Sequence, residues 1–497
     1  MARPWSLTDD PAQAQAPPRR DEAAAPAAAV APPARGGLRV ADILRADVPA
    51  LYSAMIADPF RKNRVLRTAY RLFGWLEHHG RHLTKVVYCP PLPLLWSARR
   101  GDGAPATLIH KAYLRELWRE RGPLERAVLL LSILLLWLPI NAVAVSWATA
   151  LNGAAVRRRS GKSIAAQVAE QVRLAAANNI LAPWYYTFDL HDARKRRQAA
   201  HYVHRFETKG GLYRLLKRPV AATLSPLQDK AAFAARCRRH GVRTLPVLAA
   251  CERGEVRDES GPLAQLPPVD LFCKPTCGRG GEGAERWDHV APDLYRNGAG
   301  VALSTGALLA HLRKRSLERP YLVQPRARNH AATRDLSNGA LATVRLLTCR
   351  GEGGSHEATD AVFRMAVGAN TVVDNFHAGG IAAAIDMATG TLGPATDMGL
   401  RPERGWCEVH PDTGARIAGR TLPHWPETLA LAVRAHGAFP DRVIIGWDIA
   451  ILDDGPCVIE GNGAPDLDIH QRCSGEPLGA RRLGALLALA ILQALAS

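Results

Sequence analysis

Three oxygen-bearing side chains lie in one short segment, residues 446–462, where their spacing could hold a hard cation. Two apolar, β-rich runs flank an Asp-Asp-Gly turn, which favours a hairpin. With the turn centred on Asp454, Asp448 is expected directly across from Glu460, and side-chain alternation puts Asn462 on the same face. Two carboxylates and an amide oxygen suit Mg²⁺, which leaves its other positions to water and phosphates. The alternative is a solvated acidic hairpin.

A lysine and a glycine-rich loop form a second candidate site. Residues 270–274 are expected to form a strand that ends in Lys274, and a loop rich in glycine follows it. Such a loop exposes N–H groups that can close over phosphates, and a strand-borne lysine adds a fixed positive charge. The order differs from a P-loop, and a plain hairpin is the alternative. The loop residues are Gly278, Arg279, Gly280, Gly281, Glu282 and Gly283.

Two arginines interrupt apolar strand patterns further along the chain. Arg345 lies within residues 343–348, and Arg364 repeats the feature. A planar guanidinium that points into a site would neutralise a phosphate or a carboxylate, whereas a surface charge on a half-exposed strand is the alternative. Asn375 and His377 then precede two glycines, as though the chain passed an active site there.

Length and charge bound the class of protein. The 497 residues predict two or three folded units, and the net charge of +18 comes mostly from arginine. That charge could serve an anionic membrane or phosphorylated substrates, or reflect a general preference for arginine. No nucleic-acid motif accompanies it, so no nucleic-acid partner is expected. Nine cysteines in no paired framework, and the absence of a secretory signal pattern, favour a reducing, cytoplasmic location.

A long apolar run separates two basic helical stretches. From Ala127 to Val156 there are 30 residues without a charge, and about 20 suffice to cross a hydrocarbon layer. Basic residues flank both ends equally, so the charges give no orientation. Pro139 and Asn141 could bend the run into a re-entrant hairpin. We expect membrane insertion, with a buried helix or an oligomer contact as the alternative, whereas Leu483–Ala496 is short enough for a core helix.

These patterns divide the chain into five expected regions. The last has strands alternating with helices, which indicates an α/β (α+β) body. The regions are a disordered Ala/Pro/Arg-rich tail at 1–38, a basic helical region of unknown role at 39–125, the apolar segment at 126–156, a basic helical linker at 157–223, and the catalytic body at 224–497.

Taken together, residues from about Leu224 to Gln471 resemble the ATP-grasp superfamily, especially the branch of glutathione synthetase and the ligases that add glutamate to a ribosomal protein. The shared features are a Lys-Pro with a Gly-rich loop, a strand arginine, an Asn-x-His-x-Gly-Gly turn, and a closing Asp-Ile and Glu-x-Asn hairpin. More narrowly, residues 373–386 and 465–471 look like the ATP-grasp proteins associated with sugar transfer and surface polysaccharides. The resemblance implies two lobes that clasp ATP, at about 224–320 and 321–497.

The resemblance also implies a role for each candidate residue. Arg345 and Asn375 would steady developing charge, Arg364 is a further catalytic candidate, and His377 could touch the acceptor. The residues after Glu-x-Asn are Gly-Ala-Pro-Asp and differ from those usual in the ligases, so the identity of the acceptor substrate stays open. The implied binding residues are Asp448, Glu460 and Asn462 for Mg²⁺ (two ions possible, Mn²⁺ as a substitute), Lys230, Lys274 and the loop of Gly278 to Gly283 for the phosphates, and Gln324 for the strand that meets adenine.

The activity that follows from the resemblance is carboxylate–amine ligation through an acylphosphate, in the modification or assembly of a surface polysaccharide. The expected partners are a small carboxylate, an amine or amino sugar, and the cytoplasmic face of a membrane, with an oligomer possible. Two other classes stay open. One is an ATP-dependent kinase on the same fold, and the other is a non-catalytic, membrane-held nucleotide-binding scaffold.

Overall fold

The structure is a computed structural model that describes residues 103–119, 121–217, 225–277, 283–368, 374, 376, 379–399 and 405–496. The expected tail at 1–38 and most of the basic region at 39–125 lie outside the described residues. The same holds for seven of the candidate site residues, namely Gly278, Arg279, Gly280, Gly281, Glu282, Asn375 and His377.

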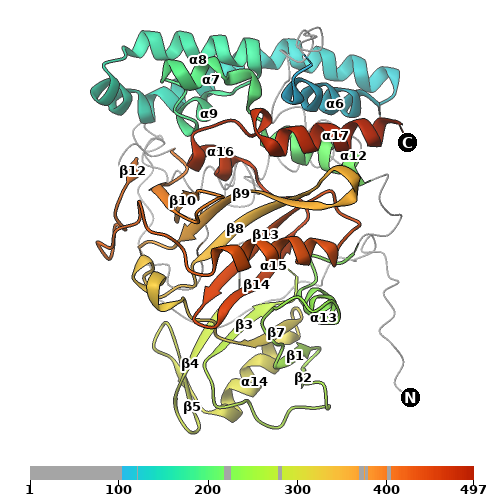
Figure 1. The fold of residues 1–497 in the computed structure, drawn as a ribbon, viewed down its shortest axis with the longest axis vertical. Helices are drawn as coiled ribbons and strands as arrows, with labels where there is room; N and C mark the ends of the chain where they lie inside the picture. Colours follow the sequence, from blue (N-terminus) through green and yellow to red (C-terminus); the bar gives the residue numbers. More distant parts are fainter. Residues whose placement is uncertain are drawn as a thin grey trace, which may run out of the picture. The chain divides into compact units, whose positions relative to one another are not determined.

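Helices make up the described chain before residue 217 (Figure 1). The longest, α7, begins at Pro123, whose fixed φ suits a first helical turn, and Glu125 accepts a hydrogen bond from the Gly122 N–H. It ends at Gly161, which takes a left-handed φ of 72°. The helices are α6 (Pro105–Arg119), α7 (Pro123–Ser160), α8 (Ile164–Asn178), α9 (Ala182–Thr187), α10 (Ala193–Arg197), α11 (Arg205–Glu207) and α12 (Tyr213–Lys217), with a π-helical turn η2 (Thr208–Leu212) before α12.

A first antiparallel sheet has the strand order β2-β1-β7-β3-β4-β5-β6, and helix α14 (Thr305–Ser316) packs on it. Residues 321–325, expected to open the second lobe, form β7 at the centre of this sheet, because β7 pairs with both β1 and β3. The first lobe therefore extends past the expected boundary at 320. Its strands are β1 (Ala249–Glu252), β2 (Glu255–Arg257), β3 (Leu271–Pro275), β4 (Glu285–Ala291), β5 (Leu294–Asn297), β6 (Ala302–Leu303) and β7 (Tyr321–Pro325).

A second antiparallel sheet has the order β12-β11-β10-β9-β8-β13-β14. This order places β8, β9, β13 and β14 side by side, although about a hundred residues separate β8 from β13 in the chain. The elements of this lobe are β8 (Thr343–Arg350), β9 (His356–Met365), β10 (Ile381–Ile385), β11 (Leu392–Thr396), β12 (Trp406–Cys407), β13 (Ile444–Leu452) and β14 (Gly455–Asn462), with helices α15 (Trp425–Gly437), α16 (Asp468–Ser474) and α17 (Arg482–Ala496).

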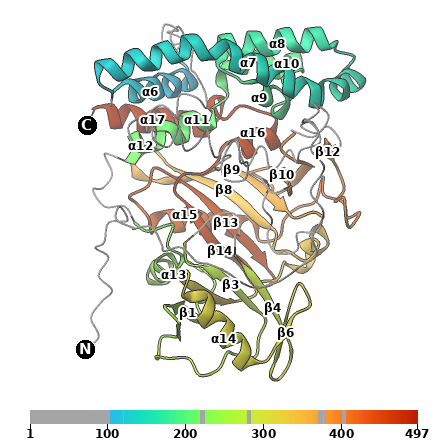
Figure 2. The ribbon, with the colours of Figure 1, turned by 180° about the vertical axis from the view of Figure 1, so that it is seen from behind.

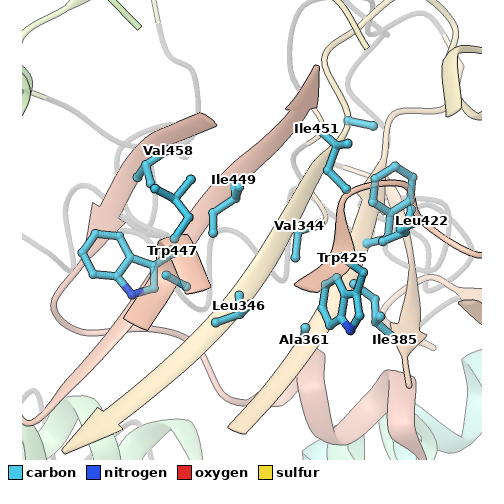
Figure 3. Close-up of a cluster of buried hydrophobic side chains, with 14 of the residues drawn as sticks. Val344, Leu346, Ala361, Ile385, Leu422, Trp425, Trp447, Ile449, Ile451 and Val458 are labelled. Carbon is cyan, nitrogen blue, oxygen red and sulfur yellow. The ribbon is translucent and has the colours of Figure 1, made fainter. Parts of the chain in front are cut away.

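One face of the second sheet is mostly apolar, with the buried Thr348 as a polar exception that accepts a hydrogen bond from Trp447 Nε1 at 2.7 Å. Alternate residues of its strands, such as Leu346, Trp447 and Ile449, form a buried cluster that α15 covers, and Figure 3 shows many of these side chains together. Helix α13 (Lys230–Arg239) also packs Phe233 into this cluster. Although α13 lies in the segment expected for the first lobe, its packing therefore anchors it to the second.

The opposite face of the second sheet is covered by α16, α17 and the helical region (Figure 2). Leu347 of β8 packs with Leu483 of α17 and Ile109 of α6, and Val362 of β9 packs with Ile469 of α16. Residues 483–496 thus form a short core helix, as expected. Polar strand residues on this face must find partners between the sheet and the helices, and the candidate site lies there.

The apolar run predicted at residues 126–156 lies inside α7. Among the described residues, no single helix satisfies the length and hydropathy of a membrane span, but two parts of α7, Pro123–Leu135 and Trp137–Ser160, satisfy them together with a bend of 44° between them.

Candidate active site

The hairpin of β13 and β14 sets the predicted cation ligands on one face. Asp448 lies directly opposite Glu460, and Asn462 lies opposite Gly446 two residues along. The turn itself comprises Asp453 and Asp454. A regular ladder from this turn, without a bulge, would pair Asp448 with residue 459. A bulge at that residue shifts the register by one and brings Glu460 across from Asp448.

Neighbouring strands supply both predicted arginines to Asp448. Arg345 of β8 is its direct neighbour in the ladder, and its Nε and Nη2 lie 2.5 Å and 3.1 Å from the two oxygens of Asp448. Arg364 of β9 places Nη2 2.9 Å from Oδ2 of the same carboxylate. Both side chains are nearly buried, at 13% and 11% exposed, so neither is a surface charge.

A fourth charged residue, Asp374, completes this array. Its Oδ1 lies 3.2 Å from Arg364 Nη2, and its Oδ2 accepts a hydrogen bond of 2.5 Å from Thr343 Oγ1. Burial by itself raises the pKa of Asp448, but Arg345 and Arg364 outweigh it and hold the pKa below its ordinary value. For Asp374, burial prevails over Arg364, and the pKa is raised. Arg364 thus bridges the two carboxylates, and Arg345 adds a second guanidinium group to Asp448.

The first sheet contributes the predicted lysine. Lys274 of β3 is 8% exposed, and burial lowers its pKa to about 8 although Glu460 and Asp448 act in the opposite direction. Lys230 begins α13, where Asp229 accepts hydrogen bonds from the N–H groups of the first turn. The Lys230 N–H donates to the Thr276 carbonyl at 3.1 Å, and its charge acts on that of Lys274. Lys274 therefore approaches the acidic hairpin from the first sheet, and Lys230 approaches Lys274 from the start of α13.

The remaining described candidates lie near the same sheet. Gln324 of β7 is buried and donates to the Leu245 carbonyl at 3.2 Å, while its Oε1 accepts no hydrogen bond within the described residues. Gly283 ends the glycine-rich loop with a φ of +75°, a left-handed conformation that residues with a side chain rarely adopt. This backbone conformation therefore favours glycine.

The hairpin residues fit a divalent cation by the chemistry of their donors. Among the described residues, no group of three or more His, Cys, Asp or Glu is placed to hold a metal. The third protein oxygen on this face of the hairpin is that of Asn462. Its Oδ1 accepts one hydrogen bond, from Ala464 N, and keeps a second lone pair. Glu460 is half-buried, and within the described residues its carboxylate makes no hydrogen bond or ion pair. Both carboxylates and this amide are hard oxygen ligands of the kind Mg²⁺ takes.

A second polar cluster, which sequence reasoning missed, follows the hairpin. Asp466 pairs with Arg205 of α11 at 2.9 Å and with Lys209 of η2 at 2.8 Å. Tyr213 of α12 donates its O–H to the carbonyl of Pro465 at 2.6 Å. These contacts attach the helical region to the segment directly after the predicted cation ligands.

Asp468 and His470 of α16 lie deepest in this second cluster, each 1% exposed. Within the described residues, neither oxygen of Asp468 and neither ring nitrogen of His470 has a hydrogen-bond partner. Burial, with Asp466 nearby, raises the pKa of Asp468 to about 7. Burial also lowers the pKa of His470 far below its ordinary value, and the charges of Arg345 and Arg364 add to this effect.

Sequence reasoning found the hairpin, both arginines and both lysines, and the structure brings these residues together. It assigned no role to Asp374, Asp466, Asp468 or His470. A signal was present in the Asp-Leu-Asp-Ile-His run, where polar residues interrupt an apolar segment soon after Asn462.

Comparison with known proteins gives one family and several distant structures. A family described as sugar-transfer associated ATP-grasp matches residues 216–485, which is more than half of the chain. Similar solved structures include the D-alanine–D-alanine ligase from Bacillus anthracis complexed with ATP (12% identity, 54% of this chain and 66% of that chain, TM-score 0.30). Others are an L-amino acid ligase from Bacillus licheniformis (10%, 53% and 48%, 0.31) and the D-alanine–D-alanine ligase from Coxiella burnetii (12%, 59% and 67%, 0.32). The match spans roughly half to two thirds of the length of these chains. No curated protein matches this chain.

Proposed function

Because this chain belongs to the sugar-transfer-associated ATP-grasp family, we propose that it is an ATP- and Mg²⁺-dependent ligase that activates a carboxylate and joins it to an amine. The observation that carries the proposal is the charge arrangement of the site. Asp448 and Glu460 lie opposite each other in one hairpin, two guanidinium groups stand beside them, and Lys274 faces them from the other lobe.

The reaction needs positioning and charge neutralisation more than a protein nucleophile. A carboxylate oxygen of the first substrate attacks the γ-phosphorus of ATP, the bond to the β,γ-bridging oxygen breaks, and ADP leaves. The amine then attacks the acyl carbon, loses a proton, and expels phosphate, which carries one oxygen of the original carboxylate. The product is an amide.

The residues of this chain divide the work between the two lobes. Lys274 of the first sheet and Lys230 at the start of α13 bind phosphate oxygens, while Arg345 and Arg364 neutralise the charge that develops as the phosphoryl group moves. Asp448, Glu460 and Asn462 would hold Mg²⁺, which when bound would neutralise phosphate charge. An anionic substrate draws the guanidinium groups from Asp448, which leaves that carboxylate free for the cation.

The acceptor amine binds at the second cluster, where Asp468 accepts the proton that the amine loses. Asp468 is buried and lacks hydrogen-bond partners among the described residues, and the charges of Asp466, Arg205 and Lys209 act on it. An amine nucleophile supplies the donors that these oxygens lack. The association of the family with sugar transfer supports an amino sugar as this acceptor, and the same proposal takes a surface polysaccharide as the destination of the product.

Isotope transfer tests the reaction directly. Purified protein is incubated with ATP, Mg²⁺ and pairs drawn from a panel of amino acids, other carboxylates, amines and amino sugars, and ADP is measured. For each pair that responds, the carboxylate is then labelled with ¹⁸O. Our proposal predicts one ¹⁸O in the released phosphate and an amide product of matching mass. A stable phosphorylated alcohol with unlabelled phosphate would identify a kinase, and ATP binding without turnover on any pair would favour a scaffold.

A further inference from the structure

One side of α7 is apolar and exposed over its first half. Of the 16 large hydrophobic residues exposed on the described chain, eight lie on this helix. Leu131, Leu135 and Leu138 are 57%, 64% and 68% exposed, and their spacing of four and three residues sets them on one stripe. The other five are Leu124, Val128, Leu130, Leu134 and Val143.

The opposite side of α7 is built into the protein. Leu129 and Ile133 pack with Tyr113 and other residues of α6, while Val145 and Ala148 lie in the cluster that also contains residues of the second sheet. Polar residues on this side are buried as well, and Gln171 of α8 donates to Thr149 at 2.8 Å. If α7 crossed a bilayer, it would leave α6, α8 and the second sheet, and the apolar residues that it covers there would be exposed to water. The helix can therefore contact lipid only along its outer side.

The charges around this stripe suit an anionic surface. Along α7 the only acidic residue is Glu125, whereas Arg126 and the last turn, with Arg157, Arg158 and Arg159, are basic and exposed. Arg119 of α6 is also exposed beside the start of α7. Basic residues near a membrane are attracted to anionic lipid headgroups, while apolar side chains enter the acyl boundary.

We propose that α7 lies flat on an anionic membrane, with the stripe of Leu131, Leu135 and Leu138 inserted below the headgroups and α6 and α8 facing the protein. The bend after Leu135 follows from Pro139, whose missing N–H leaves one carbonyl of the preceding turn without its helical donor. This docking is independent of the reaction proposed above, because none of the eight residues lies in either polar cluster.

Vesicle binding of the full chain tests this proposal. Sedimentation with vesicles of phosphatidylcholine alone, or with phosphatidylglycerol added, gives a partition coefficient for each composition. We expect the wild type to bind the anionic vesicles and the triple substitution Leu131→Gln, Leu135→Gln and Leu138→Gln to lower binding by about tenfold or more. Glutamine preserves helix propensity, and the three positions are exposed, so ATP binding should be unchanged.

Two controls separate the apolar and charged contributions. Leu317→Gln removes an equally exposed leucine, 70%, after α14 in the first lobe, and should leave vesicle binding unchanged. Replacing Arg157, Arg158 and Arg159 by glutamine should reduce the preference for anionic vesicles by about fivefold for each arginine that reaches the surface.

Four results would overturn the proposal. The first is no binding of the intact chain to anionic vesicles, and the second is equal binding by the wild type and the leucine triple variant. The third is retention of the chain on membranes through an alkaline carbonate wash, which would indicate a crossing helix. The fourth is a dimer in light scattering that the triple substitution converts to a monomer while vesicle binding persists unchanged, because the stripe would then cover a second copy.

Discussion

Replacing Asp468 by asparagine should make the protein more stable and less active. The folded state holds the carboxyl proton of Asp468 more tightly than the unfolded chain does, because burial raises its pKa from 3.8 to about 7. As pH rises between these values, the unfolded chain releases a proton that the folded protein keeps, so stability falls with pH. Above about pH 7 the full free-energy cost of burying the charged carboxylate is present. Asparagine carries no charge, so the substitution removes this cost.

The magnitude follows from the same two values. They differ by about three, and each unit of pKa corresponds to about 1.4 kcal/mol, so the stability gained by Asp468→Asn at pH 8 is up to about 4 kcal/mol. Near pH 4 the two proteins should be almost equally stable. Urea unfolding of both proteins from pH 4.5 to 8.5, followed by tryptophan fluorescence, measures this difference. Amide formation at pH 8 should fall at the same time, because the substituted side chain accepts no proton.

Asp386→Asn is the matched control. Hydrogen bonds from Thr389 and Ala388 lower the pKa of this exposed carboxyl, so it stabilises the fold above its unfolded pKa and loses that effect as pH falls. The control should therefore be less stable than the wild type at neutral pH, and the difference should narrow in acid. If Asp468→Asn behaved like this control, or if it kept full activity, the assignment of Asp468 as a buried proton acceptor would be wrong.

Two further substitutions test the framework of the site. Arg364→Gln removes a partner from the buried carboxylates of Asp374 and Asp448, and it should lower the free energy of unfolding by about 3 to 5 kcal/mol in urea unfolding. A loss below about 1 kcal/mol would contradict this pairing. Asp229→Ala removes the cap of α13, so it should lower the free energy of unfolding by about 1 kcal/mol and weaken ATP binding through Lys230. Asp229→Asn should preserve both stability and ATP binding, and equal effects of the two variants would refute the capping role.

Local patterns predicted the parts of the site that alternation along a strand controls. The family match confirms the resemblance to ATP-grasp proteins and their fold, and the hairpin register sets Asp448 across from Glu460 as expected. That register arose differently, because a tighter turn and a bulge at residue 459 compensate for each other. A bulge depends on how the strand packs, which the local sequence does not disclose.

Contacts between distant segments were beyond prediction from one sequence. Arg345 and Arg364 both reach Asp448 because β9, β8 and β13 are neighbours, and strand order is a property of the whole sheet. Asp374 was missed because a single aspartate carries no pattern. For α7, hydropathy gave the apolar run, but only packing shows which side faces the protein. Membrane association therefore stays a prediction.

The dependence of ATP binding on Mg²⁺ in Glu460→Gln tests the central claim most directly. Titration calorimetry gives the dissociation constant of ATP with and without Mg²⁺. The control is Glu357→Gln, because Glu357 lies on β9 of the same sheet and pairs with Arg482 of α17. We predict that Mg²⁺ tightens ATP binding by about tenfold or more in the wild type and the control. In Glu460→Gln this gain should vanish while the Mg²⁺-free affinity remains. An equal gain in all three proteins would contradict the assignment of the hairpin as the metal site.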